Sequence, residues 1–316
     1  MPPTLFAALG LGLRALVREP WLLAVGLLVA LVRRAALWPA WVVASVLLIR
    51  AALLAASRRP LDFVAPLEGA LAALSAPRFV ALVAGLALAG LAVGAALRIT
   101  FIAGALPTLG GAMSGEPGNR FAAGVAYGFP RVLAASALGL VLEVSGAFFG
   151  GTLALAALRV SAHAFERGGS PLLAAAVAIA MTGAIAVPLA LSAVADAAVA
   201  RAAVYGEGPG RAFASSGARF LARPGTFVLA ALVFGLAAVL GPGLVSGAGQ
   251  LATGFASGVN PVVLLGPRLM LAAIAAGVAA TVDLVWLGTV TALACGEERG
   301  EPTSGTAAPP ARFPSR

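Results

Sequence analysis

The apolar positions of this chain fall into six long runs, with little of the strict alternation that marks half-buried strands. A helix needs about 20 predominantly apolar residues to cross the roughly 30 Å of hydrocarbon in a bilayer. The runs therefore predict an all-α, polytopic transmembrane helical bundle that forms one domain over residues 1–295. The predicted spans are approximately residues 35–56, 78–97, 131–156, 171–200, 225–247 and 268–294.

Proline marks the start of each run, since it fits the first turn of a helix, where its missing N–H would have no partner. The six prolines are Pro20, Pro77, Pro130, Pro171, Pro224 and Pro267. A first span starting at Pro20 would place Arg33 and Arg34 near the bilayer centre, at about 2.5–3.5 kcal/mol each. The predicted span is therefore Ala35–Ala56. Trp21–Val32 then lies in the interface, dips in and returns, or belongs to the span.

The six runs group into three similar pairs, each preceded by a short amphipathic segment. Two of these segments are Gly115–Phe121 and Gly206–Phe213, and a looser N-terminal copy runs from Phe6 through Arg14 and Arg18 to Pro20. Gly and Pro clusters favour turns there, and the helices that follow would lie with Phe toward lipid and Arg toward head groups. The expected fold is thus three quasi-repeated helix pairs, with a cytoplasmic amphipathic segment before each.

Composition agrees with lipid as the surrounding medium. Hydrophobic residues make up 61% of the chain and charged residues 10%, with a mean hydropathy of +1.01. Soluble domains average about 25% charged residues. The net charge of +9 comes with no basic stripe and no interleaved aromatic residues, so no nucleic-acid partner is predicted. No cofactor is predicted either.

The arginines orient the chain, because positive residues are retained on the cytoplasmic side. With both termini cytoplasmic, twelve arginines lie in cytoplasmic segments: Arg14, Arg18, Arg98, Arg120, Arg131, Arg201, Arg211, Arg219, Arg223, Arg299, Arg312 and Arg316. Six lie in outer loops: Arg58, Arg59, Arg78, Arg159, Arg167 and Arg268. We expect a multi-pass protein of the bacterial cytoplasmic (inner) membrane. Residues 296–316 are polar and rich in Pro, Gly and Glu, which predicts a disordered cytoplasmic tail.

Acidic residues inside spans are candidate functional groups, because lipid makes them unfavourable. Glu143 and Asp283 lie near the middle of their spans, whereas Asp196 lies near the cytoplasmic end. They could form a proton or cation relay or a polar site between helices. Alternatively, each is protonated or hydrogen-bonded across a helix interface and serves packing. Arg50 is a possible partner for either central acid.

Helix contacts are indicated by Gly90-x-x-x-Gly94 and Gly146-x-x-x-Gly150, a spacing that lets backbones approach closely. Pro188 and Pro242 lie inside predicted spans, where proline kinks a helix. Broken helices can line transport sites, but they are also common in ordinary bundles.

Catalytic and metal chemistry find little support. The chain has one histidine, His163, expected in an outer loop, and one cysteine, Cys295, which is either a lipidated thiol or a buried inert one. No Walker A sequence and no Gly-x-Ser-x-Gly elbow occur. No catalytic residue and no metal ligand is predicted, and the chain is not expected to be an enzyme.

Around Arg120-Phe121 and Arg211–Phe213 the chain resembles bacterial six-helix inner-membrane proteins similar to the membrane domain attached to some glycerophosphoryl diester phosphodiesterases. The likeness covers roughly residues 1–295, from the Arg18-Glu19-Pro20 start through paired spans with Gly-Glu-Gly-type turns. The resemblance implies a six-span inner-membrane protein of unsettled role. The phosphodiesterase domain is absent from this sequence, so its activity is not implied.

Two main functions remain open. The first is a non-enzymatic protein that organises membrane lipid or protein partners at the cytoplasmic face, with head-group contacts through Arg14, Arg18, Arg120 and Arg211. The second is a small-solute or lipid transporter in which Glu143 and Asp283 line a polar path. An intramembrane enzyme is the least supported, because no nucleophile–base pair is evident.

Overall fold

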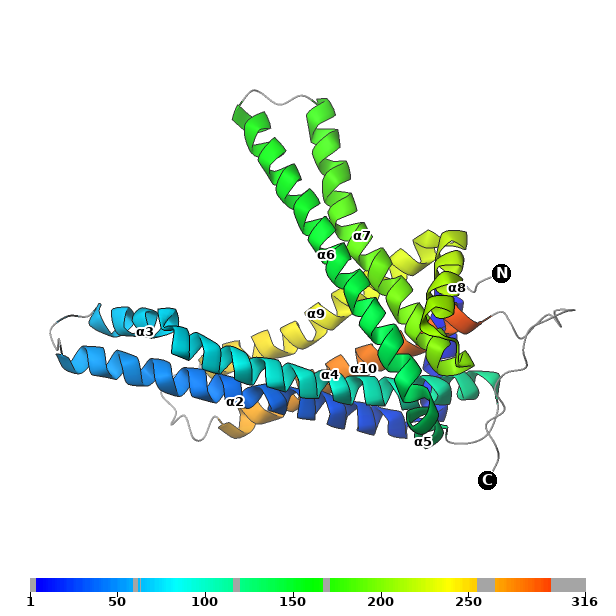
Figure 1. The fold of residues 1–316 in the computed structure, drawn as a ribbon, viewed down its shortest axis with the longest axis horizontal. Helices are drawn as coiled ribbons and strands as arrows, with labels where there is room; N and C mark the ends of the chain where they lie inside the picture. Colours follow the sequence, from blue (N-terminus) through cyan, green and yellow to red (C-terminus); the bar gives the residue numbers. More distant parts are fainter. Residues whose placement is uncertain are drawn as a thin grey trace, which may run out of the picture. The chain divides into compact units, whose positions relative to one another are not determined.

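The structure, a computed structural model, describes residues 4–58, 62, 64–115, 120–166, 171–254 and 265–296. Every element in these residues is helical (Figure 1). In chain order the elements are α1 (Leu5–Arg18), α2 (Trp21–Arg58), α3 (Ala65–Ser75), α4 (Pro77–Ser114), α5 (Phe121–Ala123), the π-helical turn η1 (Gly124–Gly128), α6 (Phe129–Glu166), α7 (Pro171–Tyr205), α8 (Pro209–Ala222), α9 (Pro224–Gly254) and α10 (Leu265–Cys295). The turn at 116–119 and residues 297–316 of the predicted tail lie outside the described residues.

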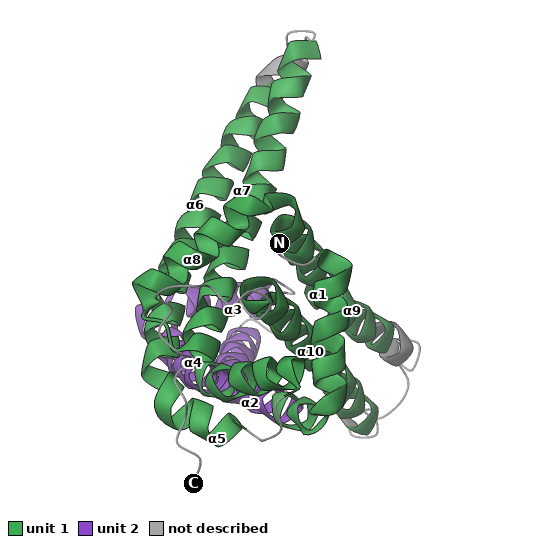
Figure 2. Ribbon diagram, turned by 90° about the vertical axis from the view of Figure 1, so that its right-hand side faces the viewer, with its two compact units in different colours: residues 1–26, 99–316 green, residues 27–98 purple. Residues whose placement is uncertain are grey.

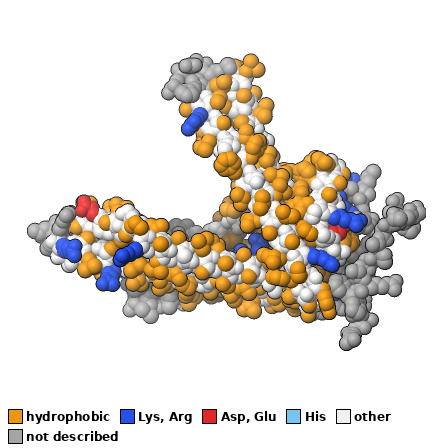
Figure 3. All heavy atoms as spheres, in the orientation of Figure 1, with side chains coloured by type: hydrophobic (Ala, Val, Ile, Leu, Met, Phe, Trp, Pro, Cys, Tyr) orange, Lys and Arg blue, Asp and Glu red, His pale blue; other side chains and the backbone are white. Residues whose placement is uncertain are grey.

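Six of the described helices are long and apolar enough to cross a membrane: α2, α4, α6, α7, α9 and α10. At 1.5 Å per residue, a helix of 31 residues such as α10 is about 46 Å long, more than the hydrocarbon thickness requires. Large apolar side chains on these helices are exposed, among them Leu88, Phe148 and Val239, and apolar atoms cover much of the surface in Figure 3. The chain is therefore an all-α, multi-pass membrane protein, as predicted.

Each predicted span lies within one of these helices, although the limits of the bilayer stay a prediction. α2 runs without a break from Trp21 to Arg58, with Pro39 inside it. A continuous helix has no turn at which Trp21–Val32 could dip in and return, so that alternative is wrong. His163 also differs from expectation, because its backbone belongs to the last turns of α6 and not to a loop.

The chain divides into two compact units, which Figure 2 distinguishes by colour. Unit 2, residues 27–98, contains α3 and the adjoining parts of α2 and α4. Its helices approach closely at glycines, since Gly90 lies against the carbonyl oxygen of Ala36. Gly94 lies against the side chain of Arg33, so the close approach predicted from this glycine pair is confirmed. The single domain predicted from the sequence stays a prediction.

Unit 1, residues 1–26 and 99–316, contains the remaining helices together with the start of α2 and the end of α4. α10 packs against α1, α7 and α9, and α6 pairs with α7 along its length. The core lies at the C-terminal ends of three long helices. It includes residues 101–112 of α4, most of 193–203 of α7 and 287–295 of α10. The sequence predicted the second span to end near residue 97, but α4 continues through this buried stretch to Ser114.

The three predicted helix pairs are present: α2 with α4, α6 with α7, and α9 with α10. A separate short helix precedes the first and third pairs, α1 and α8 respectively. Before the second pair, α5 runs through η1 directly into α6. The π turn accommodates Pro130, which lacks an N–H and whose ring would clash in an α-helix with the carbonyl of Ala126, four residues earlier. Ala126 lies in η1, where the wider π turn relieves that clash.

Glycines also set the contact between α6 and α7, so the close helix approach predicted from Gly146 and Gly150 is confirmed. A methyl group at Gly150 would lie 2.5 Å from the carbonyl oxygen of Ala184 and 2.7 Å from Cγ of Pro188. A second glycine contact was not predicted. A methyl group at Gly12 of α1 would lie 2.8 Å from the backbone of Gly288 in α10, so these two helices touch backbone to backbone.

Gly150→Ala should therefore destabilise the protein by about 1–3 kcal/mol, the usual effect of forcing extra volume into a packed interface. Thermal unfolding in detergent, followed by circular dichroism, measures the change. Gly151→Ala is the matched control, because a methyl group there meets nothing within 4 Å. Equal unfolding temperatures for the two variants would show that α6 and α7 do not pack through Gly150.

Candidate functional site

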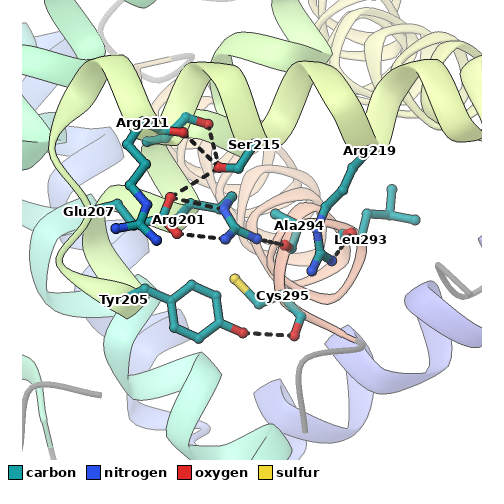
Figure 4. A network of polar contacts seen from close by, with 10 residues as sticks. Arg201, Tyr205, Glu207, Arg211, Ser215, Arg219, Leu293, Ala294 and Cys295 are labelled. Carbon is teal, nitrogen blue, oxygen red and sulfur yellow. Dashed lines mark hydrogen bonds and ion pairs between the residues drawn. The ribbon is translucent and has the colours of Figure 1, made fainter. Parts of the chain in front are cut away.

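The C-terminal turn of α10 is buried, with Leu293 and Ala294 fully inaccessible. The last carbonyl groups of a helix have no partner within the helix, and burial removes water as an alternative. Side chains from α7 and α8 supply the missing hydrogen-bond donors (Figure 4). The guanidinium of Arg201 donates a hydrogen bond to the carbonyl oxygen of Ala294 at 3.0 Å. The hydroxyl of Tyr205 donates one to the carbonyl oxygen of Cys295 at 2.9 Å.

Arg219 of α8 completes this arrangement, donating to the carbonyl oxygen of Leu293 at 3.5 Å. Three consecutive carbonyls of α10 thus accept from three different side chains, two of them cationic. The C-terminus of a helix carries partial negative charge, so guanidinium groups are favourable there beyond the hydrogen bonds alone.

Arg201 is a buried charge, since only 4% of its side chain is exposed, and it is paired with Glu207. Its Nη2 lies 2.6 Å from Oε1 of Glu207 and its Nε lies 3.0 Å from Oε2. Ser215 of α8 donates to the same Oε2 at 3.0 Å, and the Tyr205 ring lies 5.1 Å from the guanidinium carbon. A buried guanidinium is tolerated when a bidentate carboxylate neutralises it in this way.

The turn between α7 and α8 makes the pairing possible. Gly206 adopts a φ of +66°, a left-handed conformation common just after a helix and easiest for glycine. The chain reverses there, so that Glu207 reaches back to Arg201 on the preceding turn of α7. Pro209 then starts α8, which carries Ser215 and Arg219 toward the same end of α10.

The ionisation of Glu207 reflects these contacts. Partial burial raises the pKa of its carboxyl group. The hydrogen bonds and charge of Arg201, the hydroxyl of Ser215 and the charge of Arg211 outweigh that effect, so the pKa lies below its ordinary value of 4.5. Glu207 is therefore an anion at neutral pH.

Arginines meet the other two buried helix ends as well. Nη1 of Arg18 in α1 donates to the carbonyl oxygen of Ala112 at 2.7 Å, in the last turns of α4. Nη1 of Arg131 lies 2.6 Å from where a side chain on Gly206 would begin, just past the end of α7. Arg18, Arg131 and Arg219 are here called the arginine collar. Each comes from the start of a helix pair and lies at the end of the second long helix of that same pair.

Sequence reasoning did not find the arginine collar or the Arg201–Glu207 pair. It treated these arginines as topology markers or head-group contacts, and Glu207 as a turn residue. The signal that could have revealed the collar is the recurrence in each repeat of an arginine within five residues of the proline that starts a pair: Arg18 near Pro20, Arg131 beside Pro130 and Arg219 before Pro224. Gly115 and Gly206, both at positive φ, mark the helix ends that two of these arginines meet.

The predicted intramembrane acids have neighbours on other helices. Oε1 of Glu143 in α6 accepts from the hydroxyl of Ser192 in α7 at 3.4 Å. Asp196 of α7 accepts from the indole N–H of Trp286 in α10 at 2.7 Å. Asp283 is half-buried on α10, one turn before Trp286. The structure therefore brings Asp196 and Asp283 to the same stretch of α10, whereas the contact recorded for Glu143 is with Ser192.

Arg50 lies exposed on α2 in unit 2, and its pairing with a central acid stays a prediction. Of the four predicted head-group contacts, Arg14, Arg18 and Arg211 are exposed, although Arg18 also caps α4. Arg120 is half-buried and lies close to Gly111.

The phenylalanines of the short segments differ in their exposure. Phe6 is 84% exposed on α1, compatible with the expected position toward lipid. Phe121 instead packs inside unit 1, with ring centroids 5.4 Å from Trp21 and 6.2 Å from Phe101. The expectation that it faces lipid is wrong, because α5 leads directly into α6 and turns the ring onto α4.

Comparison of the chain with protein-family models, with curated proteins and with solved structures finds no match. The resemblance to six-helix inner-membrane proteins therefore stays an expectation.

Lowering the pH below 4.5 should weaken the end of the bundle held by Glu207. Because its folded-state pKa lies below the unfolded value, its stabilising contribution is complete above 4.5 and is lost as the pH falls through the folded pKa. At neutral pH, Glu207→Gln should be less stable by about 3 kcal/mol, the order expected when one partner of a buried pair is removed. The difference from the unsubstituted protein should shrink in acid. Thermal unfolding in detergent across the pH range measures both.

Arg159→Gln, on the exposed surface of α6, is the control and should leave the unfolding temperature unchanged at every pH. A Glu207→Gln difference that stays the same from neutral to acidic pH would contradict the assignment of an ionised Glu207.

Proposed function

We propose that the protein is a non-enzymatic membrane protein that organises lipid and accessory partners at one face of the bilayer. The observation that carries the proposal is the attachment of α1 and α8 to the buried ends of the long helices. Arg18 joins α1 to α4, and Arg219 joins α8 to α10. The short helices are thus held in place while Phe6, Val17 and Leu221, each at least 75% exposed, project outward.

This combination suits contact with a membrane surface. A helix with apolar side chains on one side and arginines on another lies in the interface between acyl chains and head groups. Arg14 and Arg211, both exposed, supply the positive charge on α1 and α8. A rigid attachment means that lipid or a partner bound at these helices is positioned relative to the bundle.

We place the protein in a bacterial inner membrane, with the short helices and both termini on the cytoplasmic side. The excess of arginines in the segments that contain these helices supports this orientation. Labelling of a cysteine introduced at exposed Ala214 of α8, by an impermeant thiol reagent applied to either side, tests it.

A transporter is the second candidate, and the side chains of α7 are the observation in its favour. Ser192 and Asp196 lie one turn apart on α7 and contact Glu143 of α6 and Trp286 of α10, respectively. This row of polar groups crosses three helices. Against transport, each contact pairs an acid with a neighbouring donor, which is also how a packed bundle satisfies buried carboxyl groups.

Proteoliposomes loaded with a pH-sensitive dye distinguish the two functions. An organising protein should conduct protons no faster than empty vesicles under an imposed potential, and Glu143→Gln and Asp283→Asn should change nothing. In parallel, nanodiscs cut from native membrane should hold a lipid composition different from that of the bulk bilayer. Proton flux that either substitution abolishes would show transport in place of the organising function. A lipid composition equal to that of the bulk bilayer would also contradict the organising function.

A further inference from the structure

The exposed surface of α1 has two ridges, distinct in chemistry. Phe6, Leu13 and Val17 are 84%, 42% and 75% exposed and recur at a spacing that places them on one side of a helix. Arg14 and Arg18 each follow a ridge residue by one position, and so lie about 100° further round the helix axis. An apolar ridge therefore runs beside a basic ridge.

The opposite side of α1 is buried and fixes the direction of both ridges. Ala8 and Ala15 are 0% and 1% exposed, and Gly12 touches the backbone of Gly288 in α10. A helix held by a backbone-to-backbone contact cannot rotate about its axis without losing that contact. Both ridges are thus presented in a set orientation before any ligand binds, which lowers the entropy lost on binding.

Most N–H groups of the two arginines in the basic ridge make no hydrogen bond to the described residues. Nε of Arg14 donates to the carbonyl of Gly10 in its own helix, and Nη1 of Arg18 donates to the carbonyl of Ala112. Neither contact involves a carboxylate. The nearest acid in the chain, Glu19, instead accepts from the indole N–H of Trp21 at 2.7 Å. Within the described residues, neither guanidinium group therefore has an acidic partner.

Like charges at positions i and i+4 of a helix repel each other. A phosphate between Arg14 and Arg18 would remove that repulsion, and guanidinium groups bind phosphate through paired N–H donors. The apolar ridge beside them would at the same time contact an acyl chain. One molecule combines a phosphate, a net negative charge and acyl chains: an anionic phospholipid.

We infer that the exposed surface of α1 is a binding site for an anionic phospholipid, with its head-group phosphate between Arg14 and Arg18 and an acyl chain along Phe6, Leu13 and Val17. The site rests on the proposed function, for which it names a lipid class and a location. Arg18 links the site to the bundle, because the same guanidinium caps α4.

Native mass spectrometry of the detergent-solubilised protein tests the site, with phosphatidylglycerol and phosphatidylcholine of identical acyl chains as probes. The protein should bind phosphatidylglycerol more tightly. Arg14→Gln should weaken that binding about fivefold, the contribution of one basic residue near an anionic membrane surface. It should leave phosphatidylcholine binding unchanged. Arg14 is exposed, and its hydrogen bond to the described residues stays within its own helix, so this variant should fold normally.

Three further measurements separate the site from other causes. Arg159→Gln, which removes an exposed arginine from α6, should not change binding of either lipid. Val17→Asn should weaken both lipids alike, because it alters only the apolar ridge. Glycerol phosphate, which lacks acyl chains, should compete poorly with phosphatidylglycerol, whereas a site for free phosphate would bind it equally well.

Equal affinity for the two lipids, or unchanged phosphatidylglycerol binding in Arg14→Gln, would overturn the site. Either result would leave the proposed organising function standing if native nanodiscs still hold a distinct lipid composition. Conversely, proton flux abolished by Glu143→Gln would remove the organising function without affecting lipid binding at α1.

Discussion

The hydrogen bonds from Arg201, Tyr205 and Arg219 to the last carbonyls of α10 are the interaction on which unit 1 depends. A helix end inside protein has lost water as a donor, and each carbonyl left alone there would cost about 1–3 kcal/mol. Cationic donors stabilise this position in two ways. They donate a hydrogen bond, and their positive charge is attracted to the partial negative charge at the C-terminus of the helix. The requirement draws α7 and α8 onto the end of α10, and Arg18 meets the same requirement at α4.

This constraint changes the role of the short amphipathic helices. A helix held only by the membrane interface can tilt and rotate, whereas α1 is joined to α10 at Gly12 and to α4 through Arg18. α8 is joined to α7 through Ser215 and Glu207 and to α10 through Arg219. Both helices are structural parts of unit 1 that also expose apolar and basic side chains. A protein with this construction would impose its own geometry on whatever it binds, in accordance with the proposed organising function.

Much of the fold follows from local features of the sequence. Apolar runs of sufficient length predict the long helices, and prolines predict where they start. Gly146-x-x-x-Gly150 predicts a close approach to another helix, because each of these effects acts over a few residues. The contacts of the arginines cannot be predicted from local features, because residues such as Arg18 and Ala112 are far apart in the chain and only the fold brings them together. The same holds for Phe121, whose position depends on the π turn before Pro130. The candidate site consists of arginines that contact residues far away in the chain, and composition and local spacing do not encode such contacts.

Alkylation of the only cysteine measures the central interaction directly, since Cys295 lies in the last turn of α10 and is 7% exposed. In detergent-solubilised protein, a small maleimide should modify Cys295 far more slowly than in the chain unfolded by sodium dodecyl sulfate. Arg201→Gln should speed the reaction of the folded protein about tenfold or more, because a hydrogen bond from a charged group contributes about 1.5–3 kcal/mol. If Cys295 reacts in the folded protein at the unfolded rate, or if Arg201→Gln leaves its rate unchanged, the end of α10 is not held by these side chains and the account fails.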